Sequence, residues 1–72
     1  MPEPAWFPAS DPPPDNVLVL VWIAEGLDFQ AGHDLAYRLK GGWYEALSFG
    51  VVEHEQAAYI THWQPLTRPR GA

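Results

Sequence analysis

Residues 17–24 have the sequence Val-Leu-Val-Leu-Val-Trp-Ile-Ala, which is the longest apolar run in the chain. The run is rich in β-branched residues, and its side chains are apolar on both alternations of a strand. Such a strand needs cover on two faces, so residues 17–24 predict the central strand of a sheet. The run is also too short to cross a bilayer as a helix.

The sequence on the C-terminal side of this run predicts a hairpin. Residues 33–40 alternate apolar with polar side chains, which predicts a half-exposed strand. Gly41 and Gly42 follow, and glycine accepts the positive φ angles of a tight turn. Residues 43–49 alternate again, so we expect the returning strand over this range.

A last strand is expected at residues 59–64, where the sequence is Tyr-Ile-Thr-His-Trp-Gln. Strand alternation places Ile60 and Trp63 on opposite faces of the sheet. His62 is expected to form a hydrogen bond with a neighbouring strand or loop. Pro65 ends the strand because proline lacks the N–H group that pairs with a neighbour.

The segments between these strands predict loops. Residues 25–32 contain two glycines around polar residues, which is typical of a hairpin connection. Residues 50–58 are ambiguous, and we expect a loop there with one short helical turn at 53–58.

The N-terminal residues 1–16 contain six prolines, which exclude a helix and favour extended backbone. Trp6 and Phe7 are expected to pin this segment to the body, with a short edge strand at 5–9. The sequence therefore predicts a proline-rich segment at 1–16, a single β domain at 17–66 and a flexible tail at 67–72. The expected fold is mainly β, a small antiparallel sheet of about five short strands curled into a barrel or roll.

The composition narrows the classes of function. The chain has 72 residues and no cysteine, which excludes thiolate metal sites and thiol nucleophiles and fits a cytoplasmic protein. Its formal net charge of −5 disfavours direct binding to nucleic acid, because phosphate contacts need clustered Lys and Arg. The charge favours a basic protein surface as partner, and we expect no membrane partner.

The histidines and serines are the candidates for chemistry. His33, His54 and His62 have no recognised ligand spacing, so the sequence favours surface histidines over a metal site. Ser10 and Ser48 lie in no Gly-x-Ser-x-Gly elbow. We therefore expect no catalytic residues, no metal and no cofactor, and the protein is interpreted as a non-enzyme.

Three landmarks occur in order along the chain: Trp-Phe-Pro-Ala-Ser-Asp-Pro-Pro-Pro at 6–14, Gly-Trp-Tyr at 42–44 and Thr-His-Trp-Gln-Pro-Leu at 61–66. Together they resemble the family called domain of unknown function 551, whose members are small proteins encoded mainly by tailed phages and prophages. Those members open with a Trp-x-Pro segment and close with Thr-His-Trp-x-Pro-Leu. Residues 27–32 and 51–58 depart from the family pattern. The resemblance implies a phage or prophage accessory protein, and it carries over no catalytic residues.

The leading hypothesis is a small acidic accessory protein that binds another protein. One concrete case is inhibition of a host defence complex, such as a CRISPR surveillance complex, by occupying its basic nucleic-acid path. Core packing is the first interpretation of the aromatic residues. Because both alternations of the central and final strands are apolar, a homodimer or partner interface that covers surplus apolar surface is the second. The alternatives are a small-ligand module with an aromatic pocket near Trp43, Tyr44 and Trp63, or a purely structural role. The candidate binding residues are Asp28, Phe29, Trp43, Tyr44, Glu53, Glu55 and Trp63.

Overall fold

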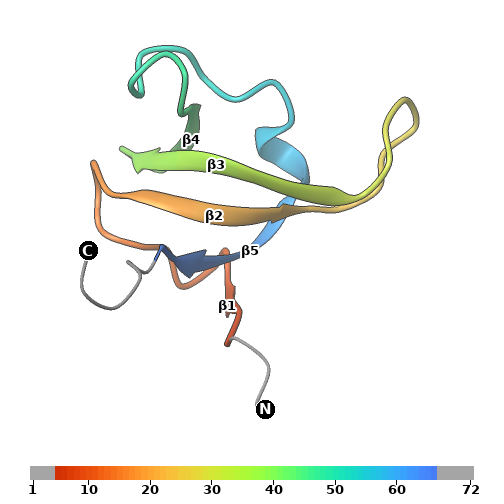
Figure 1. The fold of residues 1–72 in the computed structure, drawn as a ribbon, viewed down its shortest axis with the longest axis horizontal. Helices are drawn as coiled ribbons and strands as arrows, with labels where there is room; N and C mark the ends of the chain where they lie inside the picture. The colour runs from red at the N-terminus through yellow and green to blue at the C-terminus, as the bar shows by residue number, and fades with distance from the viewer. Residues whose placement is uncertain (1–4, 67–72) are drawn as a thin grey trace, which may run out of the picture.

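The apolar run forms strand β2 (Leu18–Ile23), which lies at the centre of a five-stranded antiparallel sheet (Figure 1). The structure is a computed structural model that describes residues 5–66. The strand order is β1-β5-β2-β3-β4. The other elements are β1 (Phe7–Pro8), β3 (Gly32–Leu39), β4 (Gly42–Glu45), the 3-10 turn η1 (Ala57–Tyr59) and β5 (Ile60–Pro65).

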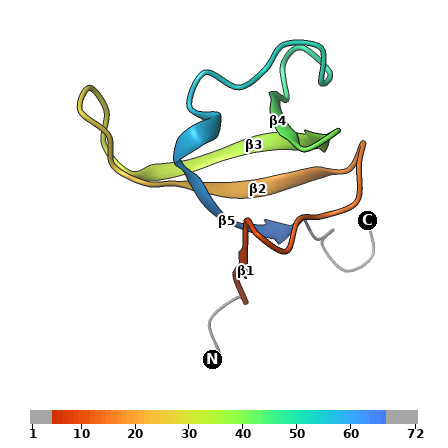
Figure 2. The ribbon, with the colours of Figure 1, turned by 180° about the vertical axis from the view of Figure 1, so that it is seen from behind.

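The prediction of a mainly β, five-stranded antiparallel fold is confirmed. The sheet is open, with β1 and β4 at opposite ends of the strand order, so a barrel or roll describes its curl only loosely (Figure 2). The expected helical turn at 53–58 is found as η1, which begins four residues later and ends one residue later. The expected tail at 67–72 lies outside the described residues.

The two faces of β2 are covered unequally. Val19, Val21 and Ile23 are buried on one face, which we call the core face, whereas the residues between them are half-buried. The rest of the buried apolar core comes from Ala36, Trp43 and Ile60. The segment from β4 to η1 and the N-terminal segment contribute residues that pack against this core, such as Ala57 and Ala9.

A shift of register in β5 overturns the expected alternation of Ile60 and Trp63. Ile60 pairs with Ile23, and His62 pairs with Trp22, so Thr61 is an extra residue in the strand. Ile60 and Trp63 therefore lie on the same, core face of the sheet. His62 is exposed, and its Nδ1 lies 2.9 Å from Thr61 Oγ1. Among residues 5–66, its ring forms no hydrogen bond to a neighbouring strand or loop, contrary to the prediction.

The hairpin of β3 and β4 turns one residue earlier than expected. Lys40 and Gly41 have φ angles of 47° and 85°, which is the pair of positive angles of a tight hairpin turn. Gly42 already belongs to β4 and pairs with Leu39. The returning strand predicted over residues 43–49 was wrong in length, because β4 ends at Glu45 and turns occupy residues 46–50.

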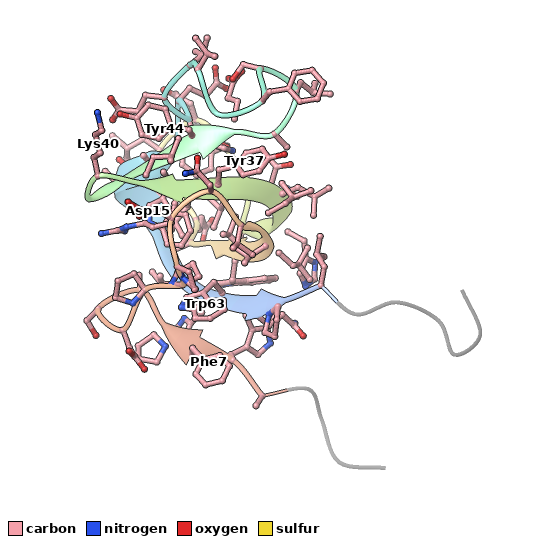
Figure 3. All side chains as sticks on the ribbon, turned by 90° about the vertical axis from the view of Figure 1, so that its left-hand side faces the viewer. Phe7, Asp15, Tyr37, Lys40, Tyr44 and Trp63 are labelled. Atoms are coloured by element: carbon pink, nitrogen blue, oxygen red, sulfur yellow. The ribbon has the colours of Figure 1, made fainter. Side chains whose placement is uncertain are left out.

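Aromatic side chains hold the N-terminal segment to the sheet, as the sequence predicted. Phe7 of β1 stacks on Trp63 of β5 at 4.9 Å between ring centroids, and β1 pairs with β5 at the edge of the sheet. The Trp63 indole N–H donates to the Asp11 carbonyl at 2.8 Å. The segment then reaches the turn between β3 and β4, where the Lys40 N–H donates to the Asp15 carboxylate at 3.3 Å (Figure 3).

Within residues 5–66, no helix is long and apolar enough to cross a membrane.

Candidate functional site

The chain leaves β4 in a loop of residues 46–51, which we call the outer loop. Residues 52–54 then run back along β4: the Glu45 N–H donates to the Val52 carbonyl, and the His54 N–H donates to the Trp43 carbonyl, each at 2.8 Å. Tyr44 and Glu53 form an antiparallel bridge between these two bonds. The outer loop is therefore the end of a small hairpin built on the edge of the sheet.

Hydrogen bonds inside the outer loop fix its backbone. The Phe49 N–H donates to the Ala46 carbonyl at 3.0 Å, and the Gly50 N–H donates to the Glu45 carbonyl at 3.1 Å. The Ser48 hydroxyl donates to the Glu45 carbonyl at 3.0 Å and accepts the Val52 N–H at 2.9 Å. Many of the backbone N–H and C=O groups of the loop are therefore paired within the loop itself, and this order does not depend on packing of its apolar side chains.

Three apolar side chains of the outer loop point into solvent. Leu47, Phe49 and Val51 are 94%, 85% and 79% exposed. Phe49 also has a φ of 54°, in the left-handed region that costs a non-glycine residue about 1–2 kcal/mol. Gly50 has a φ of 81° and packs closely, since a Cβ there would lie 3.1 Å from Leu39 Cδ1. This backbone directs the side chains outward instead of onto the core.

A pocket of about 230 Å³ adjoins the outer loop. Acidic residues from three separate segments line it, namely Asp34, Glu45 and Glu55. Leu47 also lines it, so this residue belongs to both the outer loop and the pocket. The remaining lining residues are Leu35, Ala46, His54 and Gln56.

His54 anchors the wall of the pocket to β3. Its side chain is buried, with 6% exposure, and its Nδ1 accepts the Gln56 N–H at 3.0 Å. Because Nδ1 is an acceptor, the neutral ring carries its proton on Nε2, which donates to Asp34 Oδ2 at 2.7 Å. The other Asp34 oxygen accepts the Leu35 N–H at 2.8 Å. The contact joins residues twenty positions apart and ties the hairpin of the outer loop to the sheet.

This geometry leaves little reactive chemistry at His54. The available lone pair of the neutral ring, on Nδ1, accepts the Gln56 N–H, and Nε2 carries the proton, so no lone pair is free to take a proton from a nucleophile or to bind a metal ion. The Ser48 hydroxyl is engaged twice within the loop. Among residues 5–66, no group of three or more His, Cys, Asp or Glu side chains is placed to hold a metal ion. The prediction of surface histidines was wrong for His54 and holds for His33 and His62, which are exposed.

The structure does not gather the predicted binding residues into one site. Trp43 is buried in the core beneath Arg38, whose guanidinium carbon lies 5.0 Å from the ring centroid. Its neighbour Tyr44 points to the opposite face and pairs with Tyr37, while Trp63 stacks on Phe7 (Figure 3). The expected aromatic pocket near Trp43, Tyr44 and Trp63 is therefore not assembled.

The other predicted residues lie in two separate places. Phe29 packs against the core in the loop between β2 and β3, where Asp28 is exposed. Glu53 is exposed beside β4, and Glu55 is exposed at the pocket. Sequence reasoning missed the outer loop because Leu47 and Phe49 were assigned to a strand. The Ser-Phe-Gly sequence at 48–50 was the available signal, since serine and glycine are common turn residues.

Comparison of the chain with family models, curated proteins and solved structures finds no match in any of the three. The resemblance to the domain of unknown function 551 stays a prediction that rests on the three quoted segments.

Proposed function

We propose that this protein acts by binding another protein, and that the outer loop is the centre of the contact surface. The main support is the exposure of three apolar side chains, Leu47, Phe49 and Val51, which we call the trio. They are nearly fully exposed on a backbone that hydrogen bonds hold in place. Large apolar side chains gathered on a surface are typical of protein interaction sites. A position as costly as the left-handed Phe49 is also typical of functional loops.

The size of the apolar contribution supports this proposal. Full burial of one such side chain contributes about 1.5–3 kcal/mol, so the three together could contribute about 6 kcal/mol to binding. The loss of translational and rotational freedom on association offsets part of this gain. Because the loop is already ordered, little further entropy is lost when a partner binds. The trio suits a partner with an apolar pocket.

The charge of the protein indicates what surrounds that pocket on the partner. Asp34, Glu45 and Glu55 lie beside the loop, within a chain whose formal net charge is −5. Acidic groups around an apolar centre favour a partner whose rim carries Lys and Arg. We propose a phage-type accessory role in the bacterial cytoplasm, with a basic nucleic-acid-binding host protein as partner. A CRISPR surveillance complex is one concrete case.

The test compares capture of host proteins by three forms of the protein. Immobilised wild type, the double variant Phe49→Ser/Val51→Ser and the control Leu27→Ser are incubated with bacterial host lysate at low salt. Leu27 is 99% exposed in the other hairpin loop, so Leu27→Ser removes an equally exposed apolar side chain elsewhere. We expect a protein that wild type and Leu27→Ser retain and that the double variant loses. Equal retention by all three forms, or no retained protein, contradicts the proposal.

A further inference from the structure

Strand β3 is longer than its partner β4, so part of its edge has no neighbour. β3 covers Gly32–Leu39, but β4 pairs only with residues 36–39. Within the part of the chain that the structure describes, no strand pairs with residues 32–35 on that side. We call residues 32–35 the open edge.

The direction of the backbone groups shows what the open edge offers. The Arg38 carbonyl accepts the Asn16 N–H at 3.0 Å, on the side of β2. Backbone groups alternate in direction along a strand, so those of Leu35 and His33 are directed away from β2. The Leu35 N–H is taken by its neighbour Asp34 at 2.8 Å. The Leu35 carbonyl and both backbone groups of His33 therefore stand where an added strand would pair.

The acidic pocket adjoins the open edge on one face. Asp34 lies on the core face, as does Glu45, which pairs with Ala36. Glu55 reaches the same pocket from the segment before η1. Leu35 lies on the opposite face of β3 and is 36% exposed. An added strand would therefore meet carboxylates with one set of alternate side chains and an apolar surface with the other.

We propose that the open edge receives an extended, basic segment of the protein partner, which adds to the sheet in line with β4. The segment alternates basic with apolar residues and places a Lys or Arg beside the carboxylates of Asp34, Glu45 and Glu55. This inference rests on the proposed function, because it takes the ligand to be a protein. Charge favours such a segment over a second copy of this chain. Pairing two copies edge to edge would bring two sets of these carboxylates together, and they would repel each other.

The test is a titration of the ¹⁵N-labelled protein with synthetic peptides, followed by amide chemical shifts. The probe is a blocked hexapeptide of alternating lysine and valine. A second peptide replaces lysine by glutamate, and a third carries N-methyl groups on the amides that would pair. We expect the amides of residues 32–35 to shift with the lysine peptide. The glutamate and N-methylated peptides should bind at least about tenfold more weakly, because they lose the charge match or the backbone bonds.

Two protein variants complete the test. Glu45→Gln/Glu55→Gln keeps the shape of the pocket and should weaken the lysine peptide several-fold. His33→Pro removes an N–H that the open edge offers, so it should block the edge, with His33→Ala as its control. If His33→Pro fails to fold, the N-methylated peptide still tests the pairing. Absent shifts at 32–35 with the lysine peptide, or equal binding of its N-methylated form, would overturn the inference.

The result is separable from the proposed function. Phe49→Ser/Val51→Ser leaves the pocket and the open edge in place, so it should bind the lysine peptide like wild type while losing the host partner. If the host partner depends on the outer loop but the peptide does not shift residues 32–35, only the strand addition is wrong. A dimer of the free protein, seen by light scattering, that is lost in His33→Pro and kept in His33→Ala would show a second copy at the edge and would also overturn it.

Discussion

The two long hairpin loops of this protein each contain a phenylalanine. One ring points toward the core, and the other points into solvent. In the loop between β2 and β3, the Phe29 ring packs against the core and meets Tyr59 edge-on at 5.0 Å. In the outer loop, Phe49 is 85% exposed. Figures 1 and 2 show the two loops extending from different ends of the sheet. One loop closes the body, and the other presents apolar side chains to solvent.

The backbone explains the difference. Phe29 lies over Gly26, where an added Cβ would come within 2.5 Å of the ring, so glycine leaves the room that the ring needs. Phe49 is directed outward by its positive φ and by the hydrogen bonds of Ser48 on either side of it. Outward apolar side chains on an ordered backbone indicate a contact surface, whereas a collapsed loop would have covered them.

The largest expected effect concerns the attachment of the outer loop to the body. His54→Ala should lower the free energy of unfolding by about 3 kcal/mol, because it leaves a cavity and removes partners from Asp34 and the Gln56 N–H. Chemical denaturation measures this change. His62→Ala is the matched control, and its exposed ring should contribute less than about 0.5 kcal/mol. Equal losses for the two variants would contradict the role given to His54.

The two phenylalanines should differ in their contribution to stability. Phe29→Ala should lower the free energy of unfolding by about 2 kcal/mol, less than a fully buried ring because Phe29 is partly exposed. Phe49→Ala should change it by less than about 0.5 kcal/mol, since its ring makes no comparable contact. The same denaturation experiment measures both changes, and a Phe49→Ala loss as large as that of Phe29→Ala would contradict the outward position of the Phe49 ring.

A smaller effect on stability is expected from the positive φ angle of Phe49. Phe49→Gly should raise the free energy of unfolding by about 0.5–1 kcal/mol, because glycine adopts the left-handed conformation without steric cost. Leu47→Gly is the control, since Leu47 is not among the residues with positive φ, and it should lower stability by a similar amount. Thermal unfolding of both variants measures the difference. If Phe49→Gly is instead destabilising, the outer loop does not hold Phe49 in a strained position.

The central strand could be predicted because its sequence has a strong local pattern. The run at 17–24 is apolar on both alternations and is β-branched, so the central strand followed directly. The shift at Thr61 left no such signal, because an extra residue in a strand changes no side-chain pattern before pairing is known. The end of β4 was missed because Leu47, Phe49 and Val51 are compatible with a strand.

The candidate site was harder to predict than the fold. His54 lies between Glu53 and Glu55, a local sequence that favours exposure, and its partner Asp34 is distant in the chain. The aromatic residues were predicted as binding residues because interfaces are rich in Trp and Tyr. In this small domain they are used largely for packing: Trp43 fills the core, and Trp63 holds the N-terminal segment.

The most direct test of the contact surface is photo-crosslinking from the two loops in a bacterial host. A benzophenone amino acid replaces Phe49 in one protein and Leu27 in another, because both side chains are exposed and lie in different loops. We expect a discrete crosslinked protein from position 49 that excess unmodified protein competes away, and no such product from position 27. The same products from both positions, or none from position 49, would contradict it.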